Sequence, residues 1–196
     1  KVLKTKNIFL YPSKKPLAYM NVANNSKVKS KILKEKDYIL AKNIFNLIRK
    51  NKWISALDQT KKIKDKEFKN LVNWLYLKQR GNQATFNNYQ NFISKNPNYP
   101  RIGRLRYMAE HKIILENSSP KSIINWFDGK DPLSGTGKIK LGEAYLKIGE
   151  IELGTKLIKT GWIKADLSKR DVRYYRKKFR KILITKDHLK RADYLA

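Results

Sequence analysis

Residues 141–162, with the sequence LGEAYLKIGEIELGTKLIKTGW, indicate the fold class most clearly. Its apolar residues recur mostly at three- and four-residue spacing, in two runs separated by Gly149. This spacing is typical of amphipathic helices, and glycine is typical of the position just after a helix ends. Gly154 and Gly161 lie inside the second run, where each costs about 1 kcal/mol relative to alanine. We therefore expect two helices whose backbones approach closely at these glycines.

Helical spacing extends outward from this stretch, from about residue 35 to the C-terminus. No window alternates with the period of a strand, so we expect no β-sheet. Proline and glycine divide the pattern at Gly81, Pro97, Pro120 and Pro132. The division gives about ten helices in about five hairpins, repeating every 30 to 35 residues or so. The prediction is an all-α superhelix, or solenoid, of stacked hairpins that resemble tetratricopeptide repeats.

Several details of this helical pattern can be compared with a structure. Ile39, Phe45 and Ile48 are expected on the core face of the first helix. The last two helices are expected near residues 169–182 and 186–195. Four tryptophans lie on apolar stripes and are expected in the core: Trp53, Trp74, Trp126 and Trp162.

The chain is predicted to have two parts. Residues 1–34 are basic, and Pro12 and Pro16 interrupt any helix, so they are expected to form an extended arm. Residues 35–196 are expected to form the α-superhelical domain. The sequence begins with Lys1, which suggests a processed or trimmed protein, and no apolar run is long enough to span a bilayer.

The chain is strongly basic and has no cysteine. It carries 45 lysine and arginine residues against 16 acidic ones, for a net charge of +29. Such charge can attract nucleic acid. However, most of the basic residues are lysine, and lysine, asparagine and isoleucine share AT-rich codons, so coding bias is the preferred explanation. Without cysteine, disulfides and thiolate chemistry are excluded.

The segment Gly135-Thr136-Gly137-Lys138 superficially resembles a phosphate-binding loop. That motif requires glycine five positions before the second glycine and serine or threonine after the lysine, where Pro132 and Ile139 stand. We therefore interpret the segment as a turn leading into a helix that Ser134 or Thr136 caps.

No catalytic, cofactor-binding or metal-binding residue can be assigned. The two histidines, His111 and His188, are far apart in the sequence and lie in no cluster of ligands. Near His188, we expect Thr185 to cap a helix on which Asp187 and Arg191, four residues apart, pair. The acidic residues are scattered over amphipathic helices, among them Glu110, Glu143, Glu150 and Glu152, and none has a catalytic context.

One set of marks runs in order through residues 50–196. It comprises Trp53 with Ala56, Trp74, Asn96-Pro97-Asn98-Tyr99-Pro100, Leu105-Arg106, Ala109-Glu110, Trp126-Phe127, Pro132 to Lys138, Leu141, Gly149, Trp162, and Asp187-His188 with Arg191. In their order and spacing, these marks resemble the N-terminal superhelical domain of soluble lytic murein transglycosylases.

The resemblance implies a U-shaped or ring-like helical domain that supports a separate lysozyme-like catalytic domain in the periplasm. Enzymes of this family cleave peptidoglycan between N-acetylmuramic acid and N-acetylglucosamine and release 1,6-anhydro sugars. One glutamate acts as acid and then as base. The implied partners are peptidoglycan glycan strands and the catalytic domain of the full-length protein.

The sequence departs from the family in one decisive respect. The catalytic glutamate of the family lies in a Glu-Ser motif followed by Gly-Leu-Met-Gln, and neither motif occurs here. No catalytic residue is carried over, and we expect this chain to be a non-catalytic segment of a longer superhelix.

Two other classes of function remain open: a nucleic-acid-binding solenoid and a protein-interaction solenoid. The first predicts basic residues gathered on one concave face, and the second predicts an apolar or aromatic groove. A candidate stripe for polyanions or glycans comprises Arg173, Arg176, Lys177 and Arg180, which share one helical face.

Overall fold

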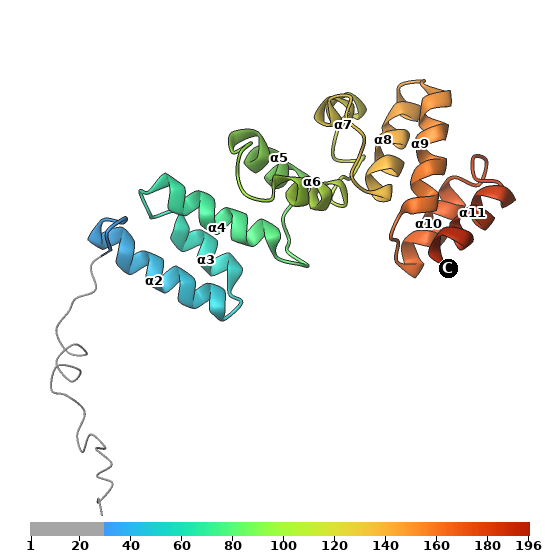
Figure 1. Cartoon of the computed structure of the whole chain (residues 1–196). Helices are drawn as coiled ribbons and strands as arrows, with labels where there is room; N and C mark the ends of the chain where they lie inside the picture. The colour runs from blue at the N-terminus through green and yellow to red at the C-terminus, as the bar shows by residue number, and fades with distance from the viewer. Residues whose placement is uncertain (1–29) are drawn as a thin grey trace, which may run out of the picture. The chain divides into compact units, whose positions relative to one another are not determined.

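The computed structural model describes residues 30–196, and every regular element within them is a helix. The all-α prediction is therefore confirmed for the described part of the chain. In chain order the helices are α2 (Glu35–Arg49), α3 (Trp53–Thr60), α4 (Lys66–Lys78), α5 (Phe86–Lys95), α6 (Ile102–Glu110), α7 (Pro120–Phe127), α8 (Gly135–Lys147), α9 (Ile151–Lys164), α10 (Lys169–Lys178) and α11 (Thr185–Leu195) (Figure 1).

Residues 1–29, which make up most of the predicted N-terminal arm, lie outside the described residues. None of the helices within residues 30–196 is both long and apolar enough to cross a bilayer. The chain divides into two compact units, Lys1–Lys69 and Asn70–Ala196, and the division falls within α4.

In the first unit, α2 packs against α3. Ala41, Ile44 and Ala56 are buried between them. The carboxylate of Asp37, also buried, accepts hydrogen bonds from the backbone N–H groups of Lys64 and Asp65 at 3.2 and 3.1 Å. Asp37 therefore joins the first turn of α2 to the segment that leads into α4.

The core face predicted for α2 is wrong for Ile39 and Phe45, whereas Ile48 is half-buried. Ile39 is 56% exposed and Phe45 is 39% exposed. The face that is buried carries Asp37, Ala41 and Ile44. Hydrophobicity alone selects the large side chains, whereas this interface uses a small alanine for close packing and an aspartate that binds backbone N–H groups.

In the second unit, α8 and α9 lie side by side, and glycines allow their close approach (Figure 1). A Cβ atom added to Gly142 would lie 2.7 Å from the carbonyl oxygen of Gly154, and one added to Gly161 would lie 2.6 Å from that of Gly135. Real Cβ atoms do not come so close to backbone atoms. The prediction that Gly154 and Gly161 allow close backbone approach is confirmed.

The core of the second unit consists of two clusters. The first joins residues of α4 to α8, with Tyr89, Leu105 and Ile123 completely buried. The second joins α8, α9 and α10 around Ile158 and Trp162. Trp162 is buried as predicted, whereas the other three tryptophans are half-buried.

Helix ends follow the capping residues more closely than the apolar pattern. The hydroxyl of Ser134 accepts a hydrogen bond from the N–H of Gly137 at 2.8 Å, as predicted for the start of α8. α5 ends at Lys95, before Pro97, as predicted. α10, however, ends at Lys178 and not near residue 182, because Phe179 and Leu183 turn into the core beyond its end.

Candidate functional site

The predicted basic stripe lies on α10 and on the turn that follows it. Arg173, Arg176 and Lys177 are in the helix, while Arg180 lies beyond its end. All four side chains are exposed, and none forms an ion pair with another described residue. The single helical face predicted for them therefore holds only for the first three.

A groove of about 580 Å³ lies next to this turn, within the second unit. Three helices and the turn after α10 provide its lining: Glu143, Leu146, Lys147, Ile151, Thr155 and residues 178–182. Arg180 is the only residue of the predicted stripe that lines it. The structure therefore separates Arg180 from the other three residues and places it beside an apolar groove.

Glu143 is the buried acidic residue of this groove. The exposed fraction of Glu143 is 5%, and its Oε1 atom pairs with the ammonium of Lys178. Burial lowers the pKa of Lys178, but hydrogen bonds with Glu143 and with the hydroxyl of Tyr174 outweigh burial and raise that pKa overall. The other oxygen, Oε2, is buried and accepts no hydrogen bond from the described protein.

Lys140 and Tyr175 lie near the same charges. Burial lowers the pKa of Lys140, opposed by the negative charge of Glu143. Burial raises the pKa of the Tyr175 hydroxyl, and Glu143 adds to the rise. Glu143 is therefore the centre of a small electrostatic cluster formed by α8 and α10.

A second hollow, of about 390 Å³, lies between the end of α4 and α6. Its lining includes Arg80, Arg104, His111 and Lys112 and no acidic residue. Burial lowers the pKa of His111. A hollow with three permanent cations and no lining carboxylate is suited to an anion.

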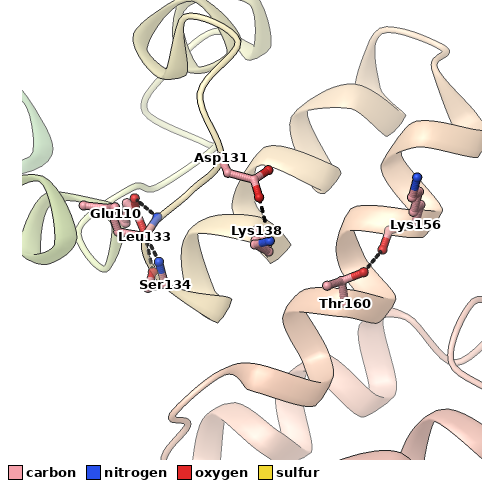
Figure 2. A network of polar contacts seen from close by, with 7 residues as sticks. All are labelled: Glu110, Asp131, Leu133, Ser134, Lys138, Lys156 and Thr160. Atoms are coloured by element: carbon pink, nitrogen blue, oxygen red, sulfur yellow. Dashed lines mark hydrogen bonds and ion pairs between the residues drawn. The ribbon is translucent and has the colours of Figure 1, made fainter.

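The buried carboxylate of Glu110 has a different kind of environment (Figure 2). Its Oε1 accepts a hydrogen bond from the N–H of Leu133 at 2.7 Å. Its Oε2 accepts two, from the N–H and the hydroxyl of Ser134 at 2.7 and 2.5 Å. Burial raises the pKa of Glu110, and the hydrogen bonds from Ser134 and Leu133 oppose this rise.

These contacts also explain the glycine-rich segment. A Cβ atom on Gly137 would lie 2.3 Å from Oε2 of Glu110, so glycine leaves room for the carboxylate at the start of α8. The anion at this helix N-terminus is therefore the protein's own side chain. Both oxygens of Glu110 are engaged and it lines neither hollow, so its role is to connect α6 to α8.

Other marks of the predicted family form similar connections. The indole N–H of Trp74 donates to the carbonyl of Pro100 at 2.8 Å, and its ring packs against Tyr99. The guanidinium of Arg106 lies over the ring of Trp126 at 5.3 Å. These particular marks therefore lie where one helix meets another.

Two expectations for the last helix are wrong in detail. The N-cap of α11 is Ile184, and Thr185 is already its first residue. Asp187 does cap this helix, by accepting from the N–H of Ile184 at 3.0 Å. The predicted pair of Asp187 with Arg191 is replaced by separate buried contacts.

Asp187 pairs with Lys159 at 3.4 Å. Arg191 donates to the carbonyls of Trp162 and Ala165, the latter at 2.8 Å, and its guanidinium lies over the ring of Trp162. Arg191 therefore binds the C-terminal end of α9, where free carbonyl groups favour a cation.

Among residues 30–196, no group of three or more histidine, cysteine or acidic side chains is placed to hold a metal ion. A scan against protein-family models found no match, and neither did searches of curated proteins and of solved structures. The function is therefore argued from the residues and their geometry.

The sequence pointed to Glu143 only as one of several acids on amphipathic helices. Its partner Lys178 lies on another helix, far along the chain, and no motif connects the two. The two residues meet because α8, α9 and α10 share one core cluster, so spacing within one helix could not have indicated the groove.

Proposed function

We propose that this chain is a helical scaffold segment of a lytic transglycosylase that acts on peptidoglycan. In this proposal the chain belongs to the superhelical, tetratricopeptide-like part of a periplasmic enzyme. A catalytic domain outside this chain cleaves the bond between N-acetylmuramic acid and N-acetylglucosamine, and the scaffold positions that domain and guides glycan strands.

The observation that carries the proposal is that residues on which the family resemblance rests make contacts between helices. Glu110 joins α6 to α8, Trp74 contacts the Tyr99-Pro100 corner, and Arg191 binds the end of α9. Residues that fix the angle between helices are those that a scaffold requires. The buried Glu110, which would otherwise be a candidate acid, has both oxygens occupied by the α8 N-terminus.

The positive charge supports attraction to peptidoglycan, whose stem peptides carry carboxylates. The exposed stripe of α10 and the hollow around Arg80 and Arg104 both present cations free of ion pairs with described acids. Long-range attraction of this kind raises the local concentration of an anionic ligand and weakens with salt.

A second candidate is a protein-interaction solenoid. It is favoured by one observation, the groove with an apolar floor beside α9. Nucleic-acid binding remains a less favoured prediction, as it was when only the sequence was considered.

The proposal is tested by sedimentation of the chain with purified peptidoglycan sacculi at low and at high salt. We expect binding at low salt that weakens as salt rises, and further weakening when Arg173 and Arg176 are both replaced by glutamate. The matched control replaces Lys36 and Lys42, exposed residues of α2, in the same way. No binding at low salt would contradict a glycan-guiding role, and equal loss in both variants would contradict a defined glycan face.

A further inference from the structure

The groove between α8, α9 and the turn after α10 has the chemistry of a peptide-docking site. We propose that it binds an acidic peptide segment of a partner protein, in which carboxylate side chains alternate with apolar ones. The proposal rests on the floor, the rim and one buried acceptor of the groove. It is independent of the role in peptidoglycan binding proposed above.

The floor of the groove is apolar. Leu146, Ile151 and Ile182 line it, and Ile151 is 60% exposed. Covering an exposed aliphatic side chain removes apolar surface from water, which is favourable. A ligand that places apolar side chains here therefore gains affinity that a purely polar ligand cannot.

The rim of the groove is cationic. Lys147, Arg180 and Lys181 are exposed and line it, and none of them forms an ion pair within residues 30–196. Cations without acidic partners complement carboxylates at the edge of an interface, where they set specificity and the rate of encounter. The charge of the rim therefore selects an acidic ligand.

The wall of the groove holds an unused acceptor. Glu143 pairs through Oε1 with Lys178, while its buried Oε2 accepts no hydrogen bond from the described protein. Buried polar atoms almost always have a partner, and a carboxylate oxygen requires a donor. Because Oε2 is buried, a ligand N–H reaches it only when the Glu143 side chain turns towards the groove. A peptide backbone offers such N–H donors between its side chains, while its carboxylates reach the rim.

These features disfavour a nucleic acid as the occupant. A phosphodiester has no donor for Oε2 and would bring its negative charge towards the carboxylate of Glu143. The exposed floor residue Ile151 is aliphatic, and Phe179, the aromatic residue of the lining, is only 5% exposed, so the groove presents no accessible ring on which a base could stack. The donor requirement and the aliphatic floor together favour a peptide.

The test uses the whole chain and a fluorescein-labelled peptide of alternating leucine and glutamate, with binding followed by fluorescence anisotropy. Control peptides replace every glutamate by lysine or every leucine by serine. We expect saturable binding of the first peptide and much weaker binding of both controls. The double variant Arg180→Glu with Lys181→Glu is expected to lose about tenfold in affinity, because two attractive rim contacts become repulsive.

Two matched variants separate the groove from general charge and hydrophobicity. Arg173→Glu with Arg176→Glu makes the same charge change on α10 outside the groove and is expected to leave peptide affinity within about twofold. Ile151→Ser is expected to weaken binding by about tenfold, whereas Ile184→Ser, at a similarly exposed site outside the groove, is not. Circular dichroism confirms that each variant is folded.

Equal losses in the two arginine double variants would overturn the proposal, because binding would then depend on overall charge. Equal binding of the lysine peptide would also overturn it. So would an oligonucleotide that binds the chain and whose affinity falls with Ile151→Ser. Failure of sacculus binding alone contradicts the glycan-guiding role and leaves peptide docking supported.

Discussion

A single carboxylate, that of Glu110, joins the last turn of α6 to the two residues that directly precede α8. It accepts three hydrogen bonds from Leu133 and Ser134, all within 2.7 Å. Hydrogen bonds to a charged group are stronger than neutral ones, and a helix N-terminus further favours a negative charge. The hydrogen bonds of this glutamate therefore hold the end of α6 next to the start of α8.

Replacing Glu110 by glutamine is expected to lower the free energy of unfolding by about 1 to 3 kcal/mol, because an amide N–H₂ group would face N–H donors. Urea unfolding followed by circular dichroism measures the change. Glu116→Gln, the same substitution at an exposed site, is expected to change stability by no more than about 0.5 kcal/mol. Equal effects of the two substitutions would contradict the proposed role of Glu110.

The pH dependence of stability provides a second test of Glu110. Burial raises the pKa of this carboxyl above its ordinary value of 4.5, so in the window above 4.5 the folded chain holds a proton that the unfolded chain releases. Stability therefore falls as pH rises through this window. The stability difference between wild type and Glu110→Gln should shrink as pH rises from 4.5, and an increase across the window would show that the pKa is lowered.

At the scale of the element, the glycines of α8 and α9 determine how closely the two helices pack. The opposed positions are Gly142 with Gly154 and Gly135 with Gly161. Backbone this close leaves no space for a methyl group, and the atoms in the way belong mainly to the backbone, which cannot move aside without separating the helices.

Gly142→Ala is expected to destabilise the chain by about 1 to 3 kcal/mol through overpacking. Gly103→Ala is the matched control. Gly103 also lies in a helix, α6, but a Cβ atom added to it would meet nothing within 4 Å. Since alanine is the better helix former, this control should be neutral or stabilising by up to about 1 kcal/mol. Thermal unfolding of both variants compares them directly, and destabilisation by both would show that packing is not the cause.

The sequence predicted this hairpin well because its signals are local: glycine positions, a stop at Gly149 and apolar residues on one face. It predicted α2 poorly, since the interface there depends on Asp37 binding backbone N–H groups from residues far along the chain. The sequence also failed to predict where α10 ends, because Phe179 leaves the helix to pack in a core formed by other helices. Local sequence patterns thus specify where helices form, while the buried face of a helix and its exact end depend on the segments that pack against it.

Candidate functional residues differ in the same way as helices and their buried faces: some follow from local sequence, and others depend on how helices pack. The marks that suggested a family were visible in the sequence, and Glu110, Trp74 and Arg191 among them contact a second helix or its end. The groove at Glu143 was not visible, because α8, α9 and α10 contribute its residues separately. The predicted stripe was correctly placed on α10 for Arg173, Arg176 and Lys177, whereas Arg180 lies at the groove.

We propose that this chain contributes architecture and binding rather than bond cleavage. The test is mass spectrometry of soluble products after the purified chain is incubated with peptidoglycan sacculi, beside an active lytic transglycosylase as positive control for 1,6-anhydro products. We expect no 1,6-anhydro muropeptides from wild type or from Glu110→Gln. Release of anhydro products by wild type that is lost in Glu110→Gln would contradict the account and identify Glu110 as a catalytic acid.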